Sequence, residues 1–172
     1  MSSGKEDSLR SLGQGSTEYT FDYPNAQLLE RFVNPALDGE GKMRKRGHWG
    51  NAVVITTDEF TSLCPVTGQP DWARIVIIYH PQEWCVESKS LKLYLAGYRN
   101  HGEFHEACVQ RILDDLVVSL KPLWMVVQGR FTPRGGIPFW PLAVYSDRNR
   151  IATTNELLLR SLERMLSPGG RL

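Results

Sequence analysis

Two helix-like segments that follow one another almost directly, between two pairs of strand-like stretches, restrict the fold of this sequence most. The first helix is predicted from about Ser88 to Tyr98 and the second from about Gly102 to Leu120. In both segments apolar residues recur at helical spacing, which predicts one buried stripe on each helix. Because so few residues join them, the helices are expected to form an antiparallel pair that packs across one face of a sheet.

Four short stretches rich in β-branched and aromatic residues predict the strands of that sheet. They are NAVVITT (51–57), ARIVIIY (73–79), LWMVVQGRF (123–131) and PFWPLAVYS (138–146). The order ββααββ predicts an α+β fold with an antiparallel four-stranded sheet and two antiparallel helices on one face. An extra C-terminal helix is predicted at TNELLLRSLERML (154–166), before the stop signal SPGG. Four strands leave two open edges, so association between subunits is expected.

Length and charge limit the class of protein. The chain has 172 residues and a net charge of +1, which fits one domain and does not indicate a polyanion as partner. Residues 1–20 are polar and predict a flexible arm, which leaves 21–172 as a single domain. No apolar run is long enough to span a bilayer, and none closely follows the first methionine. We therefore predict a cytoplasmic protein without direct contact to nucleic acid or membrane.

The loop EFTSLCPVTGQPDWA (59–73) places Cys64 among prolines and a glycine, with Asp71 seven positions later. A thiolate is a strong nucleophile towards carbonyl, imine or nitrile carbon, and a carboxyl group nearby could supply the proton that such an addition requires. The alternative is a buried thiol beside a carboxylate that caps a strand. Cys85 and Cys108 lie beside apolar residues and are predicted to be core thiols. Three cysteines without CxxC spacing fit neither a disulfide framework nor a structural zinc site.

The stretch NHGEFHEAC (100–108) has two interpretations. His101 and His105 are four residues apart and would share a helix face, as metal ligands do, with Cys64 completing a His/His/Cys zinc site. Alternatively, Glu106 accepts two hydrogen bonds from the N–H edge of a guanine-like base, with His105 beside it. A fixed carboxylate suits that edge because it presents two parallel acceptors.

Basic residues on the first helix, Lys89, Lys92 and Arg99, predict either a solvent-exposed face or a phosphate-binding stripe. The start of this helix beside Glu87 could add backbone N–H donors, and Arg134 in the TPRGG turn could add a guanidinium. The sequence has no GxxxxGK[ST] motif and no strand-coupled GxGxxG, so a nucleotide cofactor would not bind in a Rossmann crevice. The residues alone predict a reactive-cysteine enzyme with an anion-binding rim.

Four motifs give the chain a resemblance to a known family. In chain order they are FTSLCPVTGQPD (60–71), ESKSLKLYL (87–95), YRNHGEFHE (98–106) and FTPRGG (131–136). They resemble the NADPH-dependent 7-cyano-7-deazaguanine reductases, nitrile reductases of queuosine biosynthesis that are related in fold to GTP cyclohydrolase I. The resemblance implies the tunnelling fold, in which the ββααββ strands of neighbouring subunits join into a barrel. It also implies a homo-oligomer, typically a decamer of two stacked pentamers, with active sites between subunits.

The resemblance implies roles for individual residues. Cys64 resembles the nucleophile that adds to the nitrile and forms a covalent thioimide, and Asp71 resembles the proton donor to the nitrogen. The positions that hold the deazaguanine base match Val86, Glu87, Ser88, His105 and Glu106. The positions implicated in NADPH binding match Lys89, Lys92 and Arg134. Two hydride transfers from two NADPH would give the primary amine, 7-aminomethyl-7-deazaguanine, and no metal is implied.

Two other functions are weighed against the reductase. One is a zinc-dependent cyclohydrolase of the same fold, whose Cys-x-x-His pair is not matched here because Thr67 follows three positions after Cys64. The other is a non-catalytic protein that binds a purine or pterin through Glu106. The presence of both Cys64 and Asp71 argues against a protein that only binds.

Overall fold

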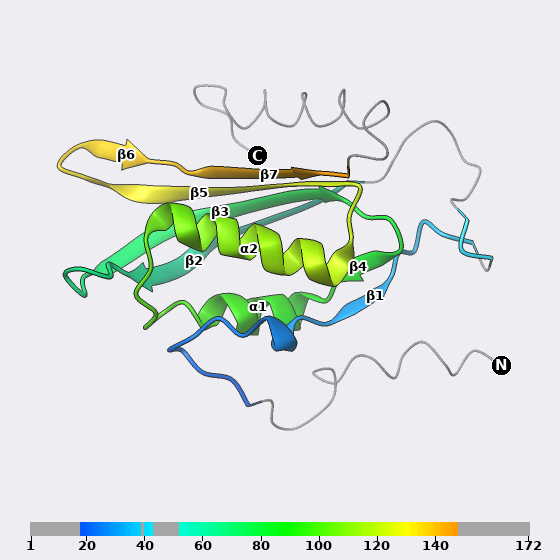
Figure 1. The fold of residues 1–172 in the computed structure, drawn as a ribbon, viewed down its shortest axis with the longest axis horizontal. Helices are drawn as coiled ribbons and strands as arrows, with labels where there is room; N and C mark the ends of the chain where they lie inside the picture. Colours follow the sequence, from blue (N-terminus) through cyan, green and yellow to red (C-terminus); the bar gives the residue numbers. More distant parts are fainter. Residues whose placement is uncertain (1–17, 39, 43–51, 148–172) are drawn as a thin grey trace.

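The structure is a computed structural model that describes residues 18–38, 40–42 and 52–147. In this part of the chain two helices cover one face of an antiparallel sheet (Figure 1). Of the predicted arm at 1–20, only residues 18–20 belong to the described residues. The predicted helix at 154–166 lies outside them entirely. Both remain predictions.

Among the described residues, five antiparallel strands form the main sheet. They are β2 (Val53–Leu63), β3 (Pro70–His80), β5 (Trp124–Arg134), β6 (Ile137–Phe139) and β7 (Leu142–Ser146). The order across the sheet is β2, β3, β5 and β6, and β7 also pairs with β5. The α+β class with an antiparallel sheet and two helices is thus confirmed. The predicted last strand, 138–146, is in fact two strands, because Pro141 between them has no N–H to donate to the ladder.

A second sheet was not predicted. It consists of β1 (Arg31–Val33) paired antiparallel with β4 (Trp84–Val86), and a short 3-10 helix, η1 (Ala26–Leu28), precedes it. No element was predicted for residues 26–28 or 31–33, because these segments are too short to give a clear pattern. Strand β4 leads directly into the first helix, so this small sheet determines where that helix starts.

The first helix, α1 (Ser88–Ala96), starts at the predicted residue and is capped by Glu87. The Glu87 carboxylate accepts hydrogen bonds from the N–H groups of Lys89 and Ser90 at 2.8 and 2.7 Å, and these would otherwise lack partners. The helix ends at Gly97, where a Cβ atom would lie 2.5 Å from the carbonyl oxygen of Tyr23. Only glycine allows the N-terminal segment to approach so closely.

The second helix, α2 (His105–Leu120), starts later than the predicted Gly102. The N–H of Leu63 bonds to the carbonyl of His101 at 2.9 Å, and the N–H of Glu103 bonds to the carbonyl of Leu63 at 3.1 Å. These bonds hold residues 101–103 extended beside the end of β2, and the helix can start only after them. The two helices run in opposite directions, as predicted (Figure 1).

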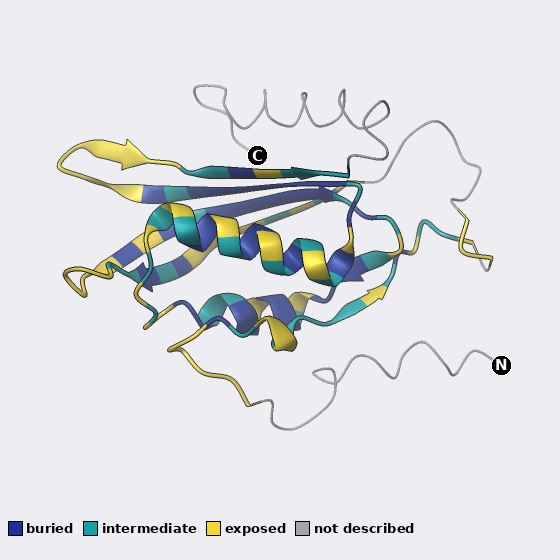
Figure 2. Cartoon of the chain, viewed as in Figure 1, coloured by how far each residue is buried: buried dark blue, intermediate teal, exposed yellow. Residues whose placement is uncertain are grey.

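The main core lies between the sheet and the helices. Ile75 and Ile77 of β3 belong to this core together with Ile112 and Leu116 of α2, and all four side chains are fully buried. The alternate residues of β3 and β5 form a smaller buried cluster on the other face of the sheet, with Val76, Ile78, Trp124 and Val126. Figure 2 shows burial along β3 and β5 and exposure at the ends of the hairpins. The central strands are therefore a rigid support for residues at their ends.

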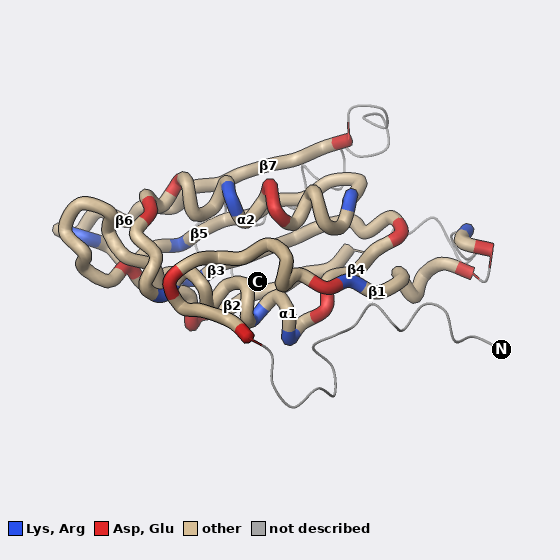
Figure 3. The backbone as a smooth tube through the Cα atoms, turned by 60° about the horizontal axis from the view of Figure 1, so that its bottom comes forward, with Lys and Arg blue, Asp and Glu red and all other residues tan. Residues whose placement is uncertain are grey.

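Acidic and basic residues are interspersed over the described chain and do not form one large patch (Figure 3). This arrangement agrees with the net charge of +1. None of the helices in the described ranges has the length and apolar character that crossing a bilayer requires.

Candidate active site

Cys64 lies in a tight turn between β2 and β3. Its N–H bonds to the carbonyl of Gln69 at 2.8 Å, and its own carbonyl accepts from the N–H of Gly68 at 2.9 Å. Gly68 has a φ of +67°, a conformation that glycine adopts without strain. The turn therefore holds Cys64, which is half-buried, at the end of the sheet, as the Pro- and Gly-containing loop indicated.

The turn also stabilises a thiolate. The pKa of Cys64 is lowered to about 6, first by the hydroxyl of Thr67, then by the backbone N–H groups of Thr67 and Val66, and further by Arg134. At pH 7 most of the Cys64 side chain is therefore in the nucleophilic form. In contrast, burial raises the pKa of Cys85 and, to about 12, that of Cys108. Both are buried free thiols, as predicted.

Asp71, the second residue of β3, is only 4% exposed and has two partners. Its Oδ1 forms an ion pair with Nη2 of Arg134, and its Oδ2 is 3.1 Å from Nε2 of His105. Because Arg134 also contacts Cys64, this guanidinium links the thiol to the carboxylate. The structure thus brings Cys64, Asp71, His105 and Arg134 together in what we call the thiol cluster.

His105 is the first residue of α2, and packing determines its orientation. Its ring stacks on Phe131 with 3.7 Å between centroids and 10° between planes. Burial lowers the pKa of His105 and so favours the neutral imidazole, which makes its 3.1 Å contact with Asp71 a polar contact and not an ion pair. Glu106 follows directly, exposed, in the first turn of α2, where the helix dipole favours a carboxylate.

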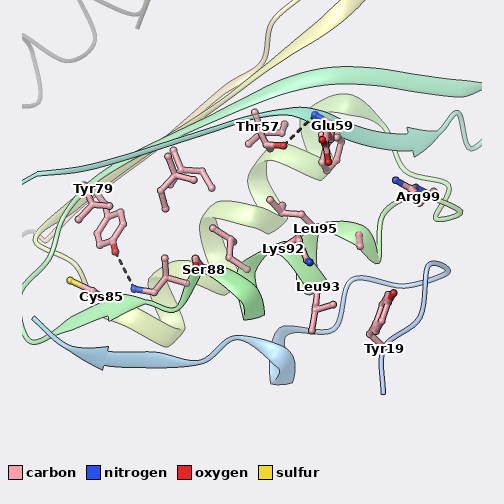
Figure 4. Close-up of a pocket in the computed structure, with 18 of the residues that line it drawn as sticks. Tyr19, Thr57, Glu59, Tyr79, Cys85, Ser88, Lys92, Leu93, Leu95 and Arg99 are labelled. Atoms are coloured by element: carbon pink, nitrogen blue, oxygen red, sulfur yellow. Dashed lines mark hydrogen bonds between the residues drawn. The ribbon is translucent and has the colours of Figure 1, made fainter. Parts of the chain in front are cut away.

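A cavity of about 720 Å³ lies between α1 and β2 (Figure 4). Three of the residues predicted for binding line it: Val86, Ser88 and Lys92. The N–H of Val86 donates to the hydroxyl of Tyr79 at 3.1 Å, which fixes the chain at the start of α1. Most of the other lining residues are apolar. The cavity therefore combines an apolar wall with a few polar groups, as small-molecule sites do.

Glu87 and Lys89 lie beside this cavity but not in its lining. Both carboxylate oxygens of Glu87 accept from backbone N–H groups of α1, and the residue is 5% exposed. In this structure the Glu87 side chain serves the helix start. We refer to Val86, Glu87, Ser88, Lys89 and Lys92 as the α1 group.

The thiol cluster and the α1 group are at opposite ends of the helix layer (Figure 1). Helix α1 starts beside β4, whereas the β2–β3 turn, the start of α2 and the end of β5 lie together at the other end. No residue of the thiol cluster lines the cavity. Within one chain, the residues predicted for the base are therefore divided between two half-sites: His105 lies beside Asp71, whereas Val86, Glu87 and Ser88 lie at the start of α1.

The structure does not support the interpretation of His101 and His105 as a helical pair. His101 lies before α2, where its Nε2 is 3.7 Å from Glu103, while His105 faces Asp71. In the described residues no three His, Cys, Asp or Glu side chains gather in a way that could hold a metal ion.

Two residues that contact the thiol cluster, Thr67 and Phe131, were not predicted from the sequence to belong to the site. Thr67 was considered only as the residue that replaces a zinc-ligating histidine, although its place in the Cys64 turn predicts contact with the sulfur. Phe131 had no local signal for its role, because its stacking with His105 depends on how α2 packs on β5.

Among solved structures, the fold is similar to that of the archaeosine synthase QueF-Like in its apo form, with a TM-score of 0.53 at 19% identity. The match covers 56% of this chain and 94% of the archaeosine synthase. A family model described as QueF-like protein matches residues 70–150. The fold is therefore that of the QueF-like class.

Curated relatives identify the family more closely. The chain is 49% identical over 137 residues to the NADPH-dependent 7-cyano-7-deazaguanine reductase of Streptococcus thermophilus (strain ATCC BAA-491 / LMD-9), a match that covers 80% of this chain and 77% of the relative. It is 48% identical over 138 residues to the enzyme of the same name from Helicobacter pylori (strain Shi470), covering 80% and 86%. The chain belongs to the family of NADPH-dependent 7-cyano-7-deazaguanine reductases.

Proposed function

We propose that this protein reduces the nitrile of 7-cyano-7-deazaguanine to the primary amine with NADPH, in the biosynthesis of queuosine for tRNA modification. The observation that carries the proposal is Cys64, whose pKa is lowered to about 6, in contact with Arg134, which is paired with Asp71. A nucleophile beside a carboxyl group is what addition to a nitrile requires. The family membership supports the same conclusion.

The reaction follows from the roles of these groups. The Asp71 carboxylate takes the proton of Cys64, the sulfur adds to the nitrile carbon, and Asp71 passes that proton to the nitrogen as a covalent thioimide forms. A first hydride from NADPH and a proton from water give a thiohemiaminal, which expels the thiolate and leaves a protonated imine. A second hydride from a second NADPH gives the amine. A closed pocket around these steps would protect the imine from hydrolysis.

The two half-sites support an active site between subunits. In this proposal His105 and Glu106 of one subunit hold the base beside Cys64, and Val86, Glu87 and Ser88 of the neighbour add contacts at the start of α1. Large apolar side chains are exposed on the same segments that carry the thiol cluster, namely Val66, Trp72, Phe104, Ile137, Phe139 and Trp140. Several exposed apolar side chains at one end of a sheet are typical of a surface that another subunit covers. The open edges at β2 and at the β6/β7 side would pair in the barrel of a homo-oligomer, for which we propose a decamer.

For the cofactor we propose Lys89, Lys92 and Arg134 as ligands of NADPH phosphates. Lys92 lines the cavity and Arg134 is half-exposed, so both could reach a bound dinucleotide. The proposal treats residues 21–172 as one catalytic domain, and a cytoplasmic location remains a prediction from the sequence.

The test is NADPH oxidation by the purified full-length protein with 7-cyano-7-deazaguanine, together with the intact mass of the protein incubated without NADPH. We expect two NADPH consumed per amine formed, and a covalent adduct that Cys64→Ala removes together with at least about 10³-fold of the turnover. Cys108→Ala, which removes a buried thiol outside the cavity lining, is the control. No oxidation of NADPH, or an adduct that persists in Cys64→Ala, would overturn the proposal.

A further inference from the structure

Arg134 contacts both groups between which charge moves in the proposed covalent step. Its Nη2 forms an ion pair with Oδ1 of Asp71, and its guanidinium lies near enough to Cys64 to help lower the pKa of the thiol. We propose that Arg134 is the counter-ion of thioimide formation, a role that it performs before NADPH binds. This inference rests on the proposed function and adds a second role to a residue predicted only as a cofactor ligand.

The charge balance of the step shows why one cation can serve throughout. In its ion pair with Arg134 the resting Asp71 is a carboxylate, and it takes the proton of the Cys64 thiol. The Cys64 thiolate then forms a C–S bond to the nitrile carbon, one C–N π bond breaks, and the nitrogen takes that proton from Asp71. Nothing is oxidised or reduced. The negative charge thus passes from Asp71 to Cys64 and returns to Asp71 when the sulfur becomes neutral. Since Arg134 touches both, it lies beside the charge at the start and at the end.

The surroundings of Asp71 make such a cation necessary. Asp71 is 4% exposed, so water screens its carboxylate poorly and an unpaired charge there would be costly. The other contact of Asp71, His105, is a poor source of that charge, because burial lowers the pKa of the imidazole and favours its neutral form. Within the described part of the chain, Arg134 is the cationic side chain that contacts Asp71.

The position of Arg134 is compatible with both roles. It ends β5, and Gly135 and Gly136, with φ of +57° and +81°, turn the chain immediately into β6. The Arg134 side chain is 49% exposed, so one side of the guanidinium faces the thiol cluster while the rest remains accessible to a phosphate. A guanidinium has enough donors for two anionic partners at once.

The first experiment measures how fast iodoacetamide alkylates Cys64 as a function of pH, with neither nitrile nor NADPH present. At pH 6 we expect Arg134→Gln to react about threefold more slowly than wild type, and Arg134→Lys to react at a rate between the two. At pH 9 the three rates should converge, because Cys64 is then a thiolate in the wild type and in both variants. Arg130→Gln is the matched control: it removes a charge from the same strand, but Arg130 contacts Gln128 and Trp140.

The second experiment follows adduct formation with 7-cyano-7-deazaguanine in the absence of NADPH by intact mass. We expect Arg134→Gln to slow it about tenfold or more and Arg134→Lys to recover part of the rate, because a charge-assisted contact is lost and then partly replaced. A raised Michaelis constant for NADPH with unchanged adduct formation and an unchanged alkylation profile would overturn the inference. Absence of the adduct in wild type would instead overturn the proposed function, so the two failures are distinguishable.

Discussion

The imidazole of His105 lies flat against the ring of Phe131, with 3.7 Å between their centroids, while its Nε2 is 3.1 Å from Asp71. One contact joins the start of α2 to β5, and the other joins it to β3. Phe131 contacts the face of the imidazole and Asp71 contacts its Nε2, and the two contacts together fix the orientation of the ring. Phe131 is thus a positioning residue for His105, and the same packing buries the imidazole and lowers its pKa.

We expect the free energy of unfolding to fall as the pH is lowered below about 6.5. The pKa of His105 is lower in the folded protein than in the unfolded chain, so the unfolded chain binds the proton first, and stability is lost as pH decreases. Burial lowers the pKa of His80 too, which acts with the same sign. Urea titrations at several pH values would measure this slope. His105→Gln should show a smaller slope than wild type, and equal slopes would contradict the expectation.

Asp71→Asn should separate chemistry from binding. We expect turnover to fall by about 10²- to 10⁴-fold, because the amide cannot donate the proton, while binding of 7-cyano-7-deazaguanine is largely retained. Glu106→Ala, in contrast, should lose binding, since the exposed carboxylate at the start of α2 is proposed to hold the base. Calorimetric titration with 7-cyano-7-deazaguanine, without NADPH, measures the binding of each variant. Equal losses of binding in the two variants would contradict the assigned roles.

Thr67→Val should raise the pKa of Cys64 from about 6 towards the ordinary value of a cysteine, because the largest cause of the lowering is the Thr67 hydroxyl. Alkylation of Cys64 at pH 6 should slow by about three- to tenfold, with little change at pH 9. Thr67→Ser keeps the hydroxyl and should behave like wild type. If valine and serine gave the same pH profile, the Thr67 hydroxyl would not be a cause of the low pKa of Cys64.

Lys92→Ala should raise the Michaelis constant for NADPH by about three- to tenfold and that for the nitrile by less, because the lysine is proposed to meet a phosphate. Lys89→Ala should act in the same direction. Lys42→Ala is a suitable control, since this exposed lysine pairs with Glu40 away from α1. Steady-state kinetics with each substrate varied in turn would decide. A larger effect on the nitrile would move the phosphate site elsewhere.

Local sequence patterns were sufficient for the secondary structure of the catalytic fold. The β-branched runs of β2, β3 and β5 and the helical spacing of α1 and α2 depend on interactions between residues close in the chain, so they could be predicted. The errors occurred where distant segments meet. Helix α2 starts at His105 because residues 101–103 pair with Leu63, and β1 forms only because β4 lies beside it.

The sequence by itself determined the chemistry that this protein carries: a cysteine in a restricted turn, a carboxylate after it, and motifs of a nitrile-reductase family. Tertiary structure decided which of these residues meet. It placed Arg134 and His105 on Asp71, and it separated the α1 group from Cys64 at opposite ends of the helix layer. The physical reason is that periodicity reports which face of an element is buried, whereas contacts between elements depend on how the buried faces pack.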